Sequence, residues 1–234
     1  MYLKLLELNN FRNYKSLVLE PGLFLNIITG QNAQGKTSIL EAIYMSCRGN
    51  SFRTNKDREI IKWGSELAYV SSILQMMDST SHVKITIKQG LKRIEINGST
   101  KRGSPLGWPG VVLFTADHLA LVKGSPYERR RFLDLELGPF HLLYAPNFSR
   151  FQRALVQRNN LLREIRKRTE NRSALKIWNE QLSRYGAKII CIRLDILKKF
   201  SPLLRVLYRE LSGDTEVFDL RYKSTLKLDG LSTE

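Results

Sequence analysis

The first 122 residues show the alternation and the short apolar runs that are typical of β-strands. Leu3 and Leu5 alternate with polar positions, and residues 17–19 are again apolar-rich after a turn, which predicts an antiparallel pair. Residues 23–29 form a nearly continuous apolar run. Such a run predicts a strand that is buried on both faces.

Further strands are expected downstream, separated by glycine-containing dipeptides that suit tight turns. The expected strands cover residues 68–76, 83–87, 93–96 and 111–114, the last of them buried, and the dipeptides are Gln89-Gly90 and Asn97-Gly98. Between the first two groups of strands, the apolar spacing after Thr37 is helical.

The pattern changes to helical after residue 122. A helix is predicted to begin at residue 125. Ser125 matches an N-cap, Pro126 matches a first-turn proline, and Glu128 matches the N3 residue that completes a capping box with Ser125. Apolar residues then recur at spacings of three and four, which predicts long helices over about 145–170 and 173–200, with Pro202 ending the second. We therefore expect a strand-rich lobe over 1–122, a helical lobe over 123–211 and a separate segment over 212–234.

Charge is distributed unevenly along the 234 residues, which carry a net charge of +16. Residues 1–122 hold 15 lysines and arginines against 9 acidic residues (+6), and residues 123–211 hold 20 against 8 (+12). The last 23 residues hold 3 against 5 (−2). A basic block favours a polyanionic partner, nucleic acid or an anionic membrane surface, although a solvated helical surface without a partner has the same composition.

Composition excludes several classes of protein. No stretch of about 18 apolar residues exists, so we expect no membrane span, and the N-terminus does not resemble a signal peptide. Cys47 and Cys191 are the only cysteines, and with three scattered histidines they give no zinc-ligand spacing. We expect a cytoplasmic protein without a structural metal.

The clearest chemical signal lies between the buried run and the first helix. The eight residues fit G-x-x-x-x-G-K-[ST], the phosphate-binding P-loop, and they are Gly30, Gln31, Asn32, Ala33, Gln34, Gly35, Lys36 and Thr37. The glycines let the backbone curl so that successive N–H groups face a phosphate, and the helix adds its positive end. Lys36 suits bridging of the β- and γ-phosphates, and the Thr37 hydroxyl suits Mg²⁺. The sequence predicts binding of a purine nucleoside triphosphate with magnesium.

Several longer motifs around the P-loop resemble the RecF family of DNA replication and repair proteins. These motifs cover residues 10–14, 37–44, 112–119, 121–134 and 152–162. The resemblance implies an α/β fold, with a P-loop head lobe like that of SMC-type, ABC-class ATPases and a second, mainly helical lobe. It also implies an ATP- and Mg²⁺-dependent DNA-binding protein of recombinational repair, replication and the SOS response.

The resemblance further implies partners and additional site residues. It implies binding of single- and double-stranded or gapped DNA, assistance to RecR and RecO in loading recombinase, and ATP-dependent dimerisation of a full-length form. Arg12 would contact phosphate and Tyr14 would lie near the adenine, unless they are a solvated turn arginine and a core tyrosine. Arg48 and Arg53 would face phosphate or DNA, or provide only surface charge. Thr115 and Asp117 would lie where related ATPases hold metal or water.

Two motifs of the family are missing from the sequence. There is no L-S-x-G-Q signature and no apolar strand ending in a Walker B acid. Residues 211–214 imitate the start of a signature, but we interpret them as a turn. We expect residues 212–234 to begin an ATPase portion that this chain lacks, so the chain should bind ATP but hydrolyse it poorly, and no catalytic residue is assigned.

The basic block offers a candidate DNA surface. Arg163 and Lys167 share one helix face, and arginines 129–131 lie in the first turns of another helix. Alternatively, the latter pair with Asp134 and Glu136 on their own helix. Other functions remain open: another SMC-like or ABC-class ATPase head, a small-molecule P-loop kinase, or a DNA-binding protein without nucleotide.

Overall fold

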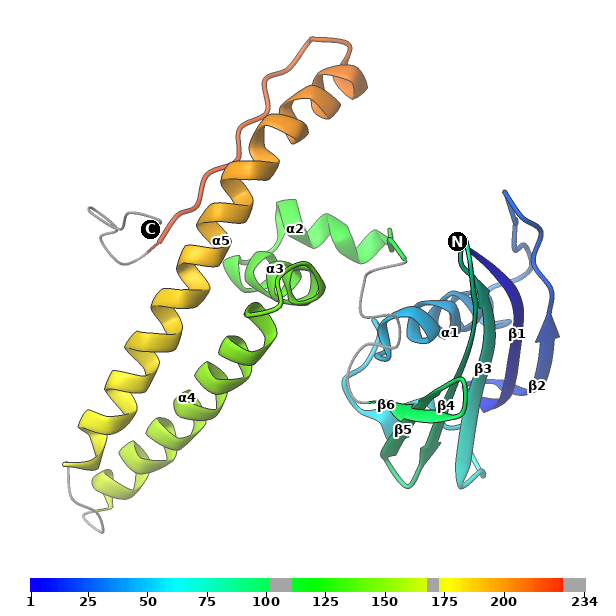
Figure 1. The fold of residues 1–234 in the computed structure, drawn as a ribbon, viewed down its shortest axis with the longest axis horizontal. Coiled ribbons are helices and arrows are strands. Elements are labelled where there is room, and N and C mark those ends of the chain that lie inside the picture. Colours follow the sequence, from blue (N-terminus) through cyan, green and yellow to red (C-terminus); the bar gives the residue numbers. More distant parts are fainter. Residues whose placement is uncertain (102–110, 168–172, 225–234) are drawn as a thin grey trace. The chain divides into compact units, whose positions relative to one another are not determined.

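The computed structural model describes residues 1–101, 111–167 and 173–224, and the chain divides into two compact units after Ala116 (Figure 1). The first unit, Met1–Ala116, contains the sheet and the P-loop helix. The second unit, Asp117–Glu234, is helical where it is described. The predicted α/β architecture, a strand-rich P-loop lobe with a mainly helical lobe, is therefore confirmed.

The first unit is built on a six-stranded antiparallel sheet with the order β2-β1-β3-β4-β5-β6. Its strands are β1 (Tyr2–Phe11), β2 (Tyr14–Leu19), β3 (Leu67–Gln75), β4 (Thr80–Lys88), β5 (Leu91–Ile96) and β6 (Ser99–Lys101). The predicted N-terminal pair is confirmed, with Leu6 opposite Leu19. Both predicted dipeptide turns are also confirmed, since Gln89-Gly90 and Asn97-Gly98 have positive φ angles and connect paired strands.

Helix α1 (Lys36–Arg48) covers one face of this sheet (Figure 1). The core between them is apolar and buried, and includes Leu6, Leu8, Phe11, Ile39, Ala42, Met45, Val70 and Ile85. Each large side chain buried in this way contributes about 1.5–3 kcal/mol. A short 3-10 turn, η1 (Asp57–Ile60), follows α1, and Ile60 joins the same core. The packing fixes the start of α1, and with it the P-loop, against the sheet.

Two strand predictions in this unit are wrong. Residues 23–29 form no strand, and Phe24 and Leu25 are 99% and 79% exposed. Residues 111–114 also form no strand, and Val112 is 96% exposed. A strand needs a hydrogen-bonding neighbour, and within the described ranges neither segment pairs with the sheet: its strands pair with one another and, through Phe11, with Ile61. Both segments are therefore apolar in sequence, but the side chains named here are exposed to solvent.

The second unit consists of helices that pack side by side. They are η2 (Ala116–Leu119, whose first residue ends the first unit), α2 (Ala120–Lys123), α3 (Pro126–Phe140), α4 (Tyr144–Arg166) and α5 (Ala174–Ser212). Helices α4 and α5 form a long hairpin (Figure 1). Leu137, Tyr144 and Ile189 form a small buried core between α3, α4 and α5.

A polar cluster ties the same three helices together. The Tyr144 hydroxyl donates a hydrogen bond of 2.5 Å to the Asp134 carboxylate, and Arg193 Nε donates one of 2.9 Å to the Tyr144 oxygen. Arg193 also forms an ion pair with Asp134. Burial, and then the bond to Asp134, raise the pKa of Tyr144, so the hydroxyl stays protonated and remains a donor.

The predicted helix boundaries hold at some ends and fail at others. Helix α3 begins after Ser125 with Pro126 in its first turn, but Ser125 makes no side-chain capping bond, so the predicted capping box does not form. The predicted end of α5 is wrong, because the helix continues through Pro202 to Ser212. The segment after α5 holds its last turns: Arg205 pairs with Asp219, and Tyr208 contacts Phe218.

Helix α5 ends at a glycine, the residue type that most often ends helices. Gly213 follows the helix in the left-handed conformation, and its N–H bonds to the Arg209 carbonyl. The prediction that residues 211–214 form a turn is thus confirmed for 213–214, while residues 211–212 end the helix. In the described parts of the chain, no helix is both long enough and apolar enough to cross a membrane.

Candidate nucleotide-binding site

The P-loop runs from the exposed segment before it into the first turn of α1. Gly30, Ala33 and Gly35 have positive φ angles of 143°, 66° and 105°, which curl the backbone. Gly35 is the N-cap, and it has no side chain that could bond to the first N–H groups of α1. The first turn of α1 holds no acidic residue. The first N–H groups of a helix have no partner within it. Here the Ser38 N–H already bonds to the Gly35 carbonyl at 2.8 Å. The N–H groups of Lys36 and Thr37, together with the positive end of the helix dipole, make the combination that binds phosphate.

The turn between β1 and β2 supports this loop from behind. Asn13 Nδ2 donates a hydrogen bond of 3.0 Å to the Gln34 carbonyl, and the Tyr14 hydroxyl donates a longer one of 3.4 Å to the same oxygen. Tyr14 thus contacts the P-loop backbone, and no lining of the pocket by Tyr14 is seen in the described structure. Tyr14 also packs against the sheet core, as the alternative of a core tyrosine expected.

Lys36 lies across the mouth of the loop. Its ammonium donates hydrogen bonds of 2.7 and 2.6 Å to the carbonyls of Gly30 and Gln31. Both bonds are exposed. A polyphosphate oxygen is a stronger acceptor than a peptide carbonyl. Lys36 can therefore exchange these bonds for contacts with phosphate.

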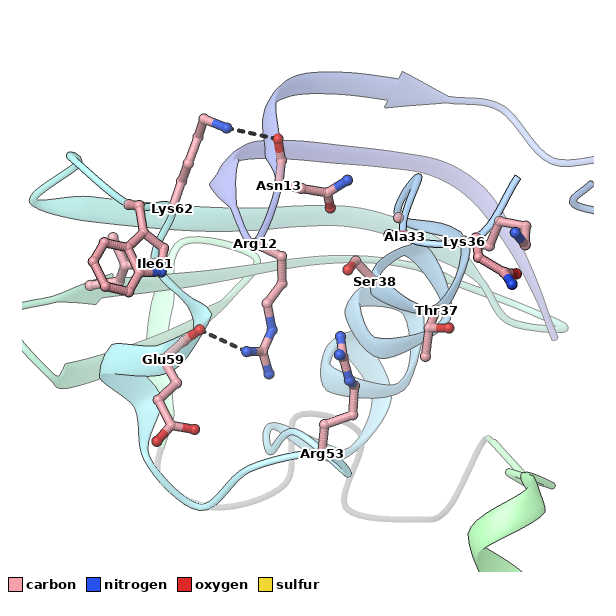
Figure 2. A pocket seen from close by; sticks show the side chains of 13 residues that line it. Arg12, Asn13, Ala33, Lys36, Thr37, Ser38, Arg53, Glu59, Ile61 and Lys62 are labelled. Atoms are coloured by element: carbon pink, nitrogen blue, oxygen red, sulfur yellow. Dashed lines mark hydrogen bonds between the residues drawn. The ribbon is translucent and has the colours of Figure 1, made fainter. Parts of the chain in front are cut away.

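A pocket of about 560 Å³ opens beside the loop (Figure 2). Its volume is within the range of small-molecule sites. It is lined by Arg12, Asn13, Asn32, Ala33, Gly35, Lys36, Thr37, Ser38, Arg53, Glu59, Ile61, Lys62 and Trp63. Six of the ten predicted nucleotide-binding residues are in this set. Gly30, Gln31, Gln34 and Tyr14 are not: Gly30 and Gln31 begin the loop, and Tyr14 contacts the Gln34 carbonyl behind it.

Arg12 enters the pocket from the β1–β2 turn. Its Nε and Nη2 atoms donate hydrogen bonds of 2.9 and 2.5 Å to the two carboxylate oxygens of Glu41, and its Nη1 atom donates one of 2.7 Å to the Glu59 carbonyl. Its side chain is 17% exposed. Arg12 is therefore a fixed wall of the pocket, and the alternative of a solvated turn arginine is wrong.

The far wall comes from the segment after η1, which the sequence reasoning missed. Lys62 Nζ donates a hydrogen bond of 2.8 Å to the Asn13 carbonyl, so this segment is tied to the β1–β2 turn (Figure 2). Trp63, the next residue, is 98% exposed and lines the pocket. The sequence gives no signal for this wall, because Trp63 stands 26 residues after Thr37 and only the fold brings it to the loop.

Comparison with known proteins agrees with this geometry. A family model described as an AAA domain matches residues 5–203. The chain belongs to the AAA domain family. Its curated relatives include the DNA replication and repair protein RecF of Pelotomaculum thermopropionicum, 49% identical over 228 residues, which are 97% of this chain and 63% of the relative. RecF of Desulforamulus reducens is 44% identical over 99% of this chain and 63% of the relative. The resemblance to the RecF family is confirmed.

A solved structure also matches. The recombination mediator protein RecF with ATP, of the RecFOR pathway, superposes with a TM-score of 0.83 at 31% identity, covering 91% of this chain and 58% of that protein. This AAA domain chain thus spans 63% of the length of the curated relatives named above. The ATP in the solved structure belongs to that RecF, and the match supports the P-loop head fold here.

Four further residues of this AAA domain protein were expected near the nucleotide, DNA or metal, and the structure places them differently. Arg53 lines the pocket, as one alternative expected. Arg48 is buried at the end of α1 and lies over the Tyr44 ring at 5.9 Å, so it is not surface charge. Thr115 ends the first unit together with Ala116, and Asp117 is exposed in η2 at the start of the second. Their role with metal or water stays a prediction.

The basic candidates lie on exposed helix surfaces of the second unit. Arg163 and Lys167, together with Arg166, are exposed around the end of α4. Arg129 donates to the carbonyls of Leu121 and Gly124 at 3.1 and 3.0 Å. Of the two acidic residues expected to pair with these helix-start arginines, Asp134 pairs with Arg193 instead. Pairing with Glu136 stays a prediction.

Proposed function

We propose that this chain is the nucleotide-binding and helical portion of a RecF-type, ATP-dependent DNA-binding protein of recombinational repair and replication. The observation that carries the proposal is the P-loop pocket, where unpaired helix N–H groups, Lys36 and two arginines converge on one space. The RecF–ATP structure, similar in fold to this chain, supports ATP as the occupant. We place the protein in the cytoplasm, with access to DNA.

The residues present fit a triphosphate with Mg²⁺. The loop amides and Lys36 suit the β- and γ-phosphates, and the exposed Thr37 hydroxyl lines the pocket, where it suits one Mg²⁺ position. Magnesium keeps several waters and needs few protein ligands in such sites. Glu59 is the carboxylate in the pocket lining, and the Thr54 hydrogen bond, partly opposed by burial, lowers its pKa.

The same residues give no candidate for fast hydrolysis. Binding requires phosphate contacts, but turnover also requires a group that orders the attacking water. We therefore propose tight ATP binding with slow or no turnover by this chain. Steady-state phosphate release tests this: turnover comparable with that of an intact ATPase head would contradict it.

The DNA contact is proposed for the second unit, whose exposed lysines and arginines face solvent on α3, α4 and α5. Contacts of this kind are made to phosphates and are independent of base sequence. If about six phosphates are neutralised, the slope of log affinity against log salt is roughly −5 on duplex DNA. RecR, RecO and an ATP-dependent second copy are proposed partners of the full-length form.

A DNA-binding titration with and without ATP–Mg²⁺ tests the combined function. We expect tighter binding to duplex and gapped DNA with ATP, and no ATP effect in Lys36→Ala. A steep salt response is expected in both proteins, because the second unit is unchanged. A flat salt response would remove the DNA assignment, and an ATP effect that persists in Lys36→Ala would remove the nucleotide dependence.

A further inference from the structure

Glu41 is the most deeply buried charged side chain near the pocket, with 0% exposure. It lies on α1, four residues after Thr37, so it is on the same helix face one turn beyond the phosphate-binding end. A buried carboxylate is costly unless hydrogen bonds and opposite charge surround it. The burial of Glu41 must therefore be compensated by the groups around it.

The Glu41 carboxylate accepts hydrogen bonds from three residues on two different segments. Arg12 provides two of them, at 2.9 and 2.5 Å. Ser51 Oγ donates one of 2.5 Å to Oε1, and Arg53 Nη1 donates one of 3.1 Å to Oε2. Ser51 Oγ in turn accepts bonds from the N–H groups of Arg53 and Thr54, which fold the loop after α1 around the carboxylate.

Both arginines held by Glu41 line the nucleotide pocket, while Glu41 itself is absent from its described lining. Figure 2 shows the Arg12 and Arg53 side chains directed toward a common space between α1 and the segment that carries Glu59. Two guanidinium groups share one carboxylate, so the cluster of these three groups keeps a net positive charge that faces the pocket.

The two arginines are held differently. Arg12 is bonded on three nitrogen atoms and is 17% exposed, so its orientation is set by Glu41 and the Glu59 carbonyl. Arg53 contacts Glu41 through one nitrogen atom, at 3.1 Å, and its side chain is 41% exposed. Arg53 is thus the arginine with more freedom to turn toward a ligand, and Glu41 is the point from which it turns.

We propose that Glu41 is a positioning residue of the nucleotide site. Its carboxylate holds Arg12 and Arg53 so that their remaining N–H groups face a polyphosphate, and it does not contact the nucleotide. This inference rests on the proposed ATP binding and adds a specific role to a residue outside the P-loop.

The direction in which Glu41→Gln changes the affinity for ATP distinguishes positioning of the arginines from simple charge compensation. Glu41→Gln keeps the size of the side chain but removes its charge, which makes the pocket more positive. If Glu41 only neutralised charge, ATP would bind more tightly to the variant. If Glu41 orients the arginines, ATP binds about 10-fold more weakly despite the added positive charge.

The experiment measures ATP–Mg²⁺ and ADP–Mg²⁺ dissociation constants by calorimetry for wild type, Glu41→Gln, Arg53→Ala and the double variant. We expect Glu41→Gln to lose more affinity for ATP than for ADP, and the loss to be smaller when Arg53 is already absent. Glu66→Gln is the matched control, because Glu66 is exposed and carries the same charge in the same unit. Its ATP affinity should stay within about 2-fold of wild type.

Unchanged or tighter ATP binding by Glu41→Gln, or equal losses for ATP and ADP that do not depend on Arg53, would overturn the inference. Absence of ATP binding by wild type would instead overturn the proposed function itself. If Glu41→Gln does not fold, Ser51→Ala removes one bond to the same carboxylate, while Arg12 and Arg53 still pair with it. We then expect ATP binding about 3-fold weaker, and unchanged binding by Ser51→Ala would be evidence against the positioning role.

Discussion

Tyr14 lies directly against Gly35, so closely that a side-chain carbon at position 35 would come within 2.7 Å of the tyrosine hydroxyl and ring. Such a carbon would also lie 2.7 Å from the Asn13 amide nitrogen. Gly35 has a φ angle of +105°, a conformation that L-residues rarely adopt. The β1–β2 turn thus forms a close-fitting back wall of the P-loop.

Gly35→Ala should therefore damage both the fold and the site. We expect a loss of about 2–4 kcal/mol in the free energy of unfolding, from backbone strain and overpacking. ATP affinity should fall at least about 100-fold, because the loop must move away from its supporting turn. Calorimetric ATP titration and thermal unfolding measure the two effects.

Gly98→Ala is the matched control for this change. Gly98 also has a positive φ angle, +79°, but nothing lies within 4 Å of an added carbon. We expect a loss of about 1 kcal/mol with ATP affinity unchanged. Equal effects of the two substitutions on ATP binding would show that the contact with Tyr14 and Asn13 is unimportant.

Trp63 provides a native optical probe of the pocket. Because it is 98% exposed and lines the pocket, a bound nucleotide should alter its environment. We expect ATP–Mg²⁺ to quench tryptophan fluorescence in wild type and in Trp178→Phe, and the quench to disappear in Trp63→Phe with binding retained. Trp63→Ala should bind ATP about 5-fold more weakly through lost stacking. A quench that persists in Trp63→Phe would place the base elsewhere.

The Asp134–Tyr144–Arg193 cluster should be essential to the second unit. Asp134→Ala leaves the Arg193 guanidinium, whose side chain is 9% exposed, without its carboxylate. We expect destabilisation of about 3–5 kcal/mol in thermal or urea unfolding. Asp195→Ala, which removes a carboxylate from an exposed pair with Lys199, should change stability by about 0.5 kcal/mol or less. Similar effects of the two variants would contradict a stabilising role for the cluster.

Cys47 should make stability depend on pH at the alkaline end. Burial raises the pKa of the Cys47 thiol to about 11 from its ordinary 9.0, with a smaller opposing effect of Arg48. Below pH 9 the thiol is neutral in both folded and unfolded chains, and its contribution is fully present. Between about 9 and 11 only the unfolded chain loses the proton, so stability falls by on the order of 2 kcal/mol.

Comparison with Cys47→Ala isolates this contribution. The difference in unfolding free energy between wild type and variant should shrink as the pH rises from 8 to 11. A difference that stays constant over that range would exclude the shifted pKa. As a second check, Cys191, which is partly exposed, should react with a thiol reagent before Cys47 does.

The sequence predicted local structure well where the signal is local. Paired strands, glycine turns and the P-loop helix follow from side-chain period and backbone conformation. The sequence failed where the outcome depends on partners: the apolar run at 23–29 was expected to be buried, but it finds no neighbouring strand in the described structure. Pro202 was expected to end α5, but the helix continues to Ser212, and residues after it contact its last turns.

The site shows the same division. The P-loop residues were identifiable because their chemistry depends on spacing along the chain. Glu41, Ile61 and Trp63 were not, because their relation to the pocket comes from α1 and the segment after η1 being brought together by the sheet core. Arg12 was named only by resemblance, and its pairing with Glu41, 29 residues away, required the fold.

ATP–Mg²⁺ binding to wild type and Lys36→Ala tests the central claim most directly. Isothermal calorimetry should give one site in wild type and at least about 100-fold weaker binding in Lys36→Ala, since the ammonium contacts with two phosphates are lost. Thermal unfolding should show both proteins equally folded. Equal affinity of the two proteins for ATP, or no binding by folded wild type at millimolar ATP, would contradict a phosphate-binding loop.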